Sequence, residues 1–298
     1  MKINEVNTHL IPIRFEYHAP TSLKEALDLL SKYGGDAAPL AGGTDLIVKM
    51  KQRLVEPKCI INIKNIDELN RVEERHDGIH IGAATRLRTI EKSEIIKAKL
   101  PLLQEAVRTI GSVQIRNMAT IGGNLCNASP AADSATALLA LDAKAHLISS
   151  EGSRTIPLEE FFTGPGRTVL KPNELLAEVS SPYLPENCGT SFQKIGRTSL
   201  DIATVNIATM LKMEGEVVSD CRIALGAVDP TPIRAHRAEE ALRGKELTDE
   251  TLKTAAKTVS GSIAPITDIR ATADYRKEAS KTLLRDALTI ARDRARRR

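Results

Sequence analysis

Two segments of the sequence join a pair of adjacent glycines to a small polar side chain: residues 40–45 (LAGGTD) and 119–124 (ATIGGN). Glycine has no Cβ, so it adopts positive φ and lets another group approach the backbone closely. Successive N–H groups that turn the same way form a concave anion site. We therefore predict that the two segments are loops that clasp the two phosphates of one dinucleotide. Two ordinary tight turns are the alternative.

Other catalytic patterns are missing from the sequence. It has no G-x-S-x-G turn and no Walker lysine. The four cysteines are scattered, and the six histidines are isolated along the chain without the spacing of a metal site. No carboxylate pair stands out as an acid–base couple. We interpret the protein as a holder for a cofactor that supplies the reactive centre, with no catalytic residue and no metal ligand of its own.

Length and composition narrow the class of protein. A chain of 298 residues is expected to form at least two domains. A net charge of +4 and an aromatic content of 3% argue against nucleic-acid binding. The first residues lack the apolar core of a signal peptide, and no apolar run is long enough to span a membrane. We expect a cytoplasmic protein.

The first glycine pair is expected between a strand and a helix. Residues 37–41 are a short apolar run, 45–51 have helical spacing, and 59–63 are a second buried strand, which together predict a β-α-β unit. A helix over 23–32 should precede it. A phosphate is favoured where a strand turns through glycines into a helix. The G-x-G-x-x-G pattern of a Rossmann fold is missing, which disfavours a nicotinamide site.

The second glycine pair follows a different set of elements. We predict a strand over 78–83 and helices over 87–94 and 100–110 before it, then a helix over 135–141, a hairpin over 143–157 and a strand over 173–179. Asp133 lies at the start of the helix over 135–141. It would cap that helix or bond a ligand hydroxyl, and the spacing leaves both interpretations open.

The last third of the chain has a different order of predicted elements, with strands first and helices after them. Residues 190–195, 203–212 and 217–225 predict a three-stranded antiparallel sheet, and helices are expected over 235–242, 248–260 and 280–298. Strands followed by helices are typical of an α+β domain. The turn-forming residues 182–188 mark the predicted boundary.

Several motifs occur here in the order of a known family: LAGGTDL at 40–46, QIRN at 114–117, TIGGN at 120–124, Asp133, FTGPG at 162–166 and AVDPTPIR at 227–234. In these motifs the chain resembles the FAD-binding medium subunit of molybdenum hydroxylases of the xanthine dehydrogenase and carbon monoxide dehydrogenase type. Within this family, we expect it to resemble the bacterial xanthine dehydrogenase-type FAD subunits. Grouped cysteines, which mark a cluster-bearing subtype, are missing.

The resemblance implies a fold and a division of the chain. An FAD domain of the PCMH or vanillyl-alcohol-oxidase type would span 10–185, with subdomains over about 10–65 and 66–185. A smaller α+β domain like the carbon monoxide dehydrogenase flavoprotein C-terminal domain would span 189–298.

The resemblance also implies cofactor-binding residues. Asp133 would bond sugar or ribityl hydroxyls, Ile110 would lie beside the isoalloxazine, and Leu176 and Lys194 would contact the adenine side or the flavin. The residues of the two glycine segments would hold the diphosphate: Ala41, Gly42, Gly43, Thr44, Asp45, Leu46, Thr120, Gly122, Gly123 and Asn124.

As to function, the resemblance implies a non-covalent FAD that takes electrons from [2Fe–2S] clusters in a small partner subunit. The substrate would be oxidised at a molybdenum-pterin in a large partner subunit, within a dimer of heterotrimers. Electrons would leave to NAD or another acceptor. Two alternatives stay open at this point: a stand-alone flavin oxidase of the same fold, and a regulatory module that binds CoA or a nucleotide.

Overall fold

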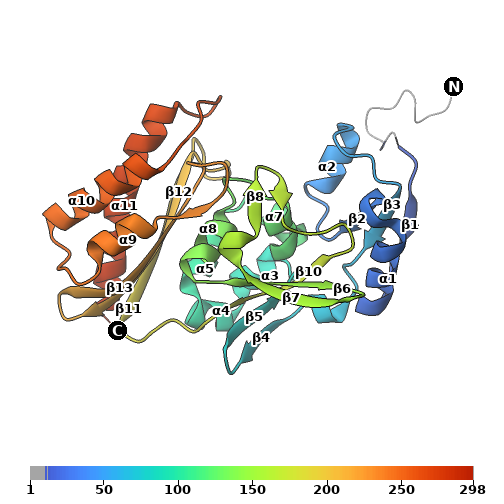
Figure 1. Cartoon of the computed structure of the whole chain (residues 1–298), viewed down its shortest axis with the longest axis horizontal. Helices are drawn as coiled ribbons and strands as arrows, with labels where there is room; N and C mark the ends of the chain where they lie inside the picture. Colours follow the sequence, from blue (N-terminus) through green and yellow to red (C-terminus); the bar gives the residue numbers. More distant parts are fainter. Residues whose placement is uncertain (1–10, 12, 298) are drawn as a thin grey trace.

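The computed structural model describes residues 11 and 13–297. The predicted domain start at residue 10 lies outside the described residues. The chain forms three units along its long axis, with the N-terminal unit and the C-terminal unit at opposite ends of a central one (Figure 1). The predicted α+β class is confirmed.

The N-terminal unit is a small parallel sheet with two helices. Its strands are β1 (Glu16–His18), β2 (Ala37–Leu40) and β3 (Cys59–Asn62), in the order β1-β3-β2. Helix α1 (Leu23–Tyr33) is capped by Ser22, whose side chain accepts a hydrogen bond from the backbone N–H of Glu25. Helix α2 (Leu46–Lys51) follows the first glycine pair. The predicted β-α-β unit is thus present, and β1 adds a strand at its edge.

The central unit has a five-stranded antiparallel sheet. Its strands, in spatial order, are β4 (Val72–Arg75), β5 (Gly78–Gly82), β10 (Leu175–Ser181), β6 (Lys144–Ser149) and β7 (Gly152–Pro157). The hairpin β6–β7 was predicted. Strand β4 was not, because Val72-Glu73-Glu74-Arg75 lacks alternating apolar residues.

Six helices complete the central unit: α3 (Leu87–Lys92), α4 (Glu94–Lys99), α5 (Pro101–Arg108), α6 (Val113–Met118), α7 (Ile121–Cys126) and α8 (Asp133–Ala140). With the sheet they enclose one apolar core, to which every one of them except α6 contributes buried residues. Helix α8 is buried along its whole length, which its small residues permit. A two-stranded ribbon, β8 (Phe162–Gly164) and β9 (Arg167–Thr168), lies in the segment predicted as a loop.

The C-terminal unit is an antiparallel sheet with three helices. Strands β11 (Cys188–Ile195), β12 (Val205–Glu214) and β13 (Val217–Gly226) match the prediction, and β14 (Ile233–Arg234) adds a fourth strand at the edge. The helices are α9 (His236–Leu242), α10 (Asp249–Ser262) and α11 (Ala273–Ala295). Helix α11 begins seven residues earlier than predicted, because Thr272 caps it through the Tyr275 backbone N–H.

The C-terminal sheet has a core on each face. One face packs against α9 and α11, with α10 lying on these two helices. The other face sends Phe192, Ala208 and Ala224 into the apolar core of the central unit. The sheet thereby lies against α8, next to the second glycine pair. Among the described residues, no helix is long and apolar enough to cross a membrane.

Candidate cofactor site

Three neighbouring cavities run from the N-terminal unit to the C-terminal sheet. The loop cavity, of about 230 Å³, lies between the two glycine pairs. The Asp133 cavity, of about 270 Å³, lies toward the C-terminal sheet, and the Leu176 cavity, also about 270 Å³, lies toward α1 and β10. Adjacent cavities share lining residues, so the three form one row.

Every residue predicted to contact the cofactor lines this row. The loop cavity has Ala41, Gly42, Gly43, Thr44, Asp45, Leu46, Thr120, Gly123 and Asn124. The Asp133 cavity adds Ile110, Asp133 and Lys194, and the Leu176 cavity adds Gly122 and Leu176. The residues predicted from the sequence therefore come from all three units, and the fold brings them together.

The first glycine pair is a loop with unused hydrogen-bond donors. It connects β2 to α2, and Gly43 has φ +76°, a conformation that favours glycine. The backbone N–H groups from Gly42 to Leu46 have no acceptor among the described residues. Unpaired N–H groups between a strand and a helix form a site for an anionic oxygen. This segment has the predicted geometry.

The two glycine segments touch through Gly42. A Cβ built on Gly42 would collide with the carbonyl oxygen of Met118 and lie 2.7 Å from the Cα of Ala119. Only a glycine allows this backbone approach. The loop before α2 is therefore packed directly against the chain that enters α7.

The second glycine pair differs from the prediction, because it belongs to a helix and not to a loop. Gly122 and Gly123 lie in the first turn of α7, which Thr120 caps by accepting a hydrogen bond from the Gly123 N–H at 3.1 Å. The Gly122 N–H donates to the carbonyl oxygen of Ala83 at 2.8 Å. These N–H groups are already used within the protein. The pair offers a surface without side chains and no open set of donors.

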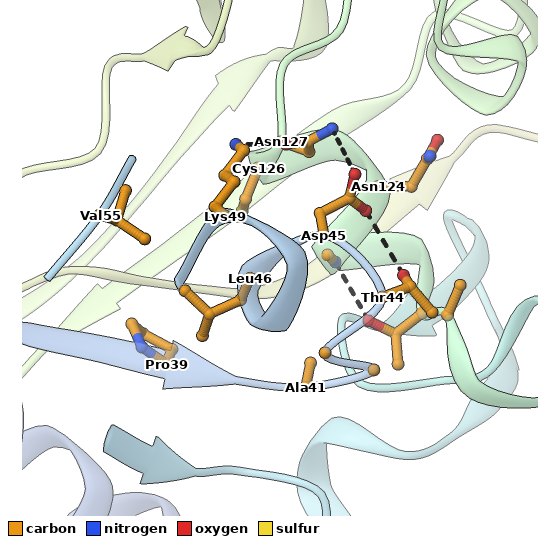
Figure 2. Close-up of a pocket in the computed structure, with 15 residues that line it drawn as sticks. Pro39, Ala41, Thr44, Asp45, Leu46, Lys49, Val55, Asn124, Cys126 and Asn127 are labelled. Carbon is orange, nitrogen blue, oxygen red and sulfur yellow. Dashed lines mark hydrogen bonds between the residues drawn. The ribbon is translucent and has the colours of Figure 1, made fainter. Parts of the chain in front are cut away.

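Lys49 adds a positive charge to the loop cavity. Its Nζ donates to the side-chain oxygen of Asn127 at 2.7 Å, and the Asn127 amide donates to Asp45 at 3.1 Å (Figure 2). Residues from α2 and from the end of α7 are thereby linked across the cavity. Neither Lys49 nor Asn127 was predicted as a site residue. The helical spacing of Asp45 and Lys49, four residues apart, is the signal that could have identified the lysine.

The Asp133 cavity contains a buried ion pair. Lys194 on β11 lies 2.6 Å from Asp133, whose carboxylate also accepts hydrogen bonds from Asn206 at 2.6 Å and Thr109 at 3.1 Å. Burial raises the pKa of Asp133, and these three partners oppose that shift. The interpretation of Asp133 as a helix cap is wrong, because Ala132 occupies the N-cap position.

Arg116 braces the wall of the Asp133 cavity. It belongs to the QIRN motif, is only 6% exposed, and donates to the carbonyl oxygens of Ile110 and Gly111 at 3.0 and 2.9 Å. Its guanidinium also pairs with Glu91 at 2.9 Å. Burial raises the pKa of Glu91, but Arg116 and Arg88 outweigh it, so the net shift is downward. The hydrogen bonds from Arg116 thus hold the backbone at Ile110 and Gly111 in place.

The Leu176 cavity has mainly apolar walls. Leu30, Ile63 and Leu176 contribute side chains to it, and Gly123 connects it to the loop cavity. Cys126 lines both cavities, and burial raises the pKa of its thiol to about 12. The thiol therefore stays protonated at neutral pH, which makes it a poor nucleophile.

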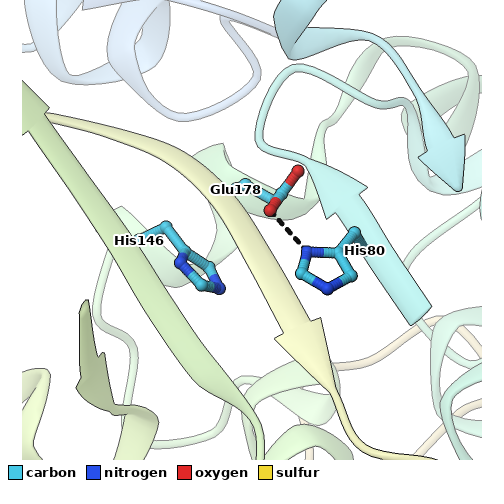
Figure 3. A group of neighbouring side chains, drawn as sticks. All are labelled: His80, His146 and Glu178. Atoms are coloured by element: carbon cyan, nitrogen blue, oxygen red, sulfur yellow. Dashed lines mark hydrogen bonds and ion pairs between the residues drawn. The ribbon is translucent and has the colours of Figure 1, made fainter. Parts of the chain in front are cut away.

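His80 and His146 are isolated along the sequence, but the fold brings them together. Together with Glu178 they form a group on β5, β6 and β10 whose ligand-type atoms lie within 4.8 Å of one another (Figure 3). His80 pairs with Glu178 at 2.6 Å and with Asp77 at 3.0 Å. Arg75 donates to both Glu178 oxygens at 3.0 and 2.8 Å. Because the guanidinium already supplies the positive charge, we assign the group as an ion-paired network.

The residues that line the row of cavities have the chemistry that a bound dinucleotide needs. Unpaired backbone N–H groups and Lys49 lie in the middle, where a diphosphate would need donors. One end is apolar, as an adenine requires, and the other combines Ile110 with the Asp133–Lys194 pair. The residues present therefore fit FAD.

Comparisons with known proteins agree with this geometry. Residues 13–184 match the family described as FAD binding domain in molybdopterin dehydrogenase, and residues 190–291 match the carbon monoxide dehydrogenase flavoprotein C-terminal domain. The glyceraldehyde dehydrogenase medium chain of Sulfolobus acidocaldarius is 39% identical over 275 residues, which cover 92% of this chain and 97% of the relative.

A solved structure and a second sequence relative extend the comparison. The carbon monoxide dehydrogenase from Hydrogenophaga pseudoflava superposes with a TM-score of 0.93 at 38% identity, covering 96% of this chain and 99% of that chain. The XdhB protein of Escherichia coli, described as a putative xanthine dehydrogenase FAD-binding subunit, is 34% identical over 92% of this chain and 95% of its own length. The protein therefore belongs to the molybdopterin dehydrogenase FAD-binding family, as an FAD-binding oxidoreductase subunit of the molybdenum hydroxylase type.

Proposed function

We propose that the chain holds FAD non-covalently along the row of cavities. The adenine would occupy the Leu176 cavity, the diphosphate the loop cavity, and the ribityl chain with the isoalloxazine the Asp133 cavity. The run of unpaired N–H groups from Gly42 to Leu46 carries this proposal, because it lies where the row needs donors for an anion. The protonated thiol of Cys126 supports non-covalent binding.

We further propose that the subunit relays electrons. A bound FAD would supply the redox chemistry between the [2Fe–2S] clusters of a small subunit, as single-electron donors, and NAD or another acceptor. The chain itself binds the cofactor, orients it with Ile110 and Lys194, and covers it with the C-terminal sheet. The substrate would be oxidised at the molybdenum-pterin of a large subunit, and the complex would be a cytoplasmic dimer of heterotrimers.

The cofactor part of the proposal is tested on the purified chain. It should be yellow, with absorption near 450 nm, and acid denaturation should release FAD. Gly43→Val should leave a colourless protein, because a side chain in the loop blocks backbone approach, whereas Gly35→Val should stay yellow. Gly35 is the control because a Cβ there meets nothing within 4 Å. A yellow Gly43→Val protein would contradict the placement of the diphosphate.

The partner part is tested on the complex isolated from its own cells through a tag on this chain. Two further subunits, molybdenum and iron should accompany the flavin. Anaerobic NADH should bleach the 450 nm band if NAD is the acceptor, since electron flow is reversible near equilibrium. Isolation of the chain alone, without molybdenum or iron, would contradict the proposed electron relay but not the proposed FAD site.

A further inference from the structure

A buried cluster joins the C-terminal sheet to the start of α8. Lys194 on β11 and Asn206 on β12 are direct neighbours in the strand register. Both side chains reach across to Asp133, with Lys194 Nζ and Asn206 Nδ2 each 2.6 Å from a carboxylate oxygen. The C-terminal unit thereby contributes a cation to the lining of the Asp133 cavity and an amide to the carboxylate that holds this cation.

The hydrogen bonds of Asp133 are nearly complete within the protein. One carboxylate oxygen accepts from Asn206, and the other accepts from Lys194 and from the Thr109 hydroxyl at 3.1 Å. A carboxylate has about four acceptor positions, so three are filled. Asp133 is therefore arranged to hold Lys194 more than to receive a ligand hydroxyl.

Lys194 has the opposite balance. An ammonium group has three donors, and two are used, by Asp133 and by the carbonyl oxygen of Thr109 at 2.9 Å. The third has no acceptor among the described residues. The Lys194 side chain is only 9% exposed, and it lines the Asp133 cavity together with Ile110 and Ile202. The free N–H can reach only a group that enters this cavity or the water within it.

The anchor of the lysine is itself rigid. The Asn206 side-chain oxygen accepts from the Thr136 hydroxyl at 2.8 Å, which fixes the direction of its amide toward Asp133. Gly226, paired with Asn206 on β13, leaves room for this contact, since a Cβ there would lie 2.6 Å from the Thr136 hydroxyl. The position of the Lys194 ammonium is thus set, through Asp133, by residues on β12, β13 and α8.

We propose that the free N–H of Lys194 donates to a carbonyl oxygen of the flavin ring, and that Asp133 is the positioning residue that holds this lysine in place. The inference rests on the FAD placement proposed above. An ammonium hydrogen-bonded to the ring lies closer to it than the carboxylate does. Electron density added to the ring on reduction is then stabilised, strongly so in a buried cavity. The pair should favour the reduced cofactor and raise its midpoint potential.

The test compares variants of the full chain loaded with FAD. Lys194→Met, Asp133→Asn and the double variant are measured for FAD affinity by flavin fluorescence and for midpoint potential by dye equilibration. Lys194→Met should weaken binding of reduced FAD about tenfold more than binding of oxidised FAD, a fall of about 30 mV for a two-electron couple. Asp133→Asn should also lower the potential, because a buried ammonium without its partner moves away from the ring.

Three comparisons make the result decisive. The double variant should show no further fall, because both changes remove one interaction. Lys49→Met is the matched control, since the diphosphate charge does not change on reduction. It should weaken both oxidation states equally and leave the potential unchanged. Lys194→Arg keeps the charge and should retain most of the potential, and it carries the test if Lys194→Met binds no flavin.

Three results would overturn the inference. The first is an unchanged potential in Lys194→Met, and the second is a full fall in Lys194→Arg. The third is an Asp133→Asn variant that weakens both oxidation states equally and adds to the effect of Lys194→Met, which would make Asp133 a direct partner of the ligand. A wild-type chain that binds no FAD would instead remove the proposed function itself.

Discussion

The two glycine pairs share a sequence pattern and differ in what their backbones do. At Gly42 and Gly43 the chain is a loop whose N–H groups stay unpaired. At Gly122 and Gly123 it is the first turn of α7, and the N–H groups are bonded to Ala83 and Thr120. One pair provides donors for a ligand, and the other provides close packing beside it.

The contrast shows how one site divides its tasks. Gly122 lies so near the Ala83 backbone that a Cβ would be 2.7 Å from its carbonyl oxygen. A Cβ built on Gly43 would meet only side-chain atoms, the closest of them 3.0 Å away. The rigid pair therefore serves as the wall against which the donor-bearing loop is held. Substitutions in the two pairs should accordingly fail in different ways.

The contact between the two segments gives the largest expected effect. Gly42→Ala places a methyl group against the backbone of Met118 and Ala119, neither of which can turn away. We expect the free energy of unfolding to fall by about 3 kcal/mol, the upper part of the range for overpacking. Urea denaturation measures this, with Gly35→Ala as the control, which should stay within about 0.5 kcal/mol of wild type.

The charge at the loop cavity comes next. Lys49→Met removes the cation beside the unpaired N–H groups, and FAD affinity should fall about tenfold, the effect of one charge-assisted hydrogen bond. The loss should shrink at high salt, because the cavity is open to solvent. Fluorescence titration at two ionic strengths checks both statements. An affinity that does not change would mean that Lys49 serves only to hold Asn127.

Gly43 distinguishes backbone conformation from packing. Gly43→Ala forces a Cβ into the left-handed region at φ +76°, which costs about 1–2 kcal/mol. Because its neighbours are flexible side chains, most of this cost should appear as lost FAD affinity when the loop relaxes. Isothermal titration and urea denaturation of the same protein separate the two quantities. A stability loss as large as that of Gly42→Ala would show that the loop is packed as tightly as the helix.

The cap of α7 gives the smallest effect. Thr120→Ala removes the acceptor for the Gly123 N–H, and the free energy of unfolding should fall by about 1 kcal/mol. Thr120→Ser keeps the hydroxyl and should stay near wild type. FAD affinity should change little in either variant if the N–H groups of α7 serve the fold. A gain in affinity for Thr120→Ala would show that the released N–H reaches the ligand.

Much of this arrangement could be predicted from the sequence. The alternation of β5 and the amphipathic spacing of α1 and α5 gave local signals, and the motif order located the residues that line the three cavities. The helical state of residues 121–126 could not be predicted, because two glycines disfavour a helix. Burial of α7 against Ala83 overrides that preference.

Other features depend on contacts between distant parts of the chain. The group of His80, His146 and Glu178 assembles from three strands whose pairing order is not readable locally. The same holds for Asn206, which meets Asp133 across 73 positions. Lys49 was within reach of sequence reasoning, and only its spacing from Asp45 pointed to it.

The shared core between the central unit and the C-terminal sheet has a consequence for synthesis. Phe192, Ala208 and Ala224 close an apolar core whose other members all precede them in the chain. A ribosome therefore exposes the preceding apolar surface of α8 before the strands that cover it have emerged. We expect the nascent chain to need shielding during that interval, and fragments that stop near residue 185 to aggregate.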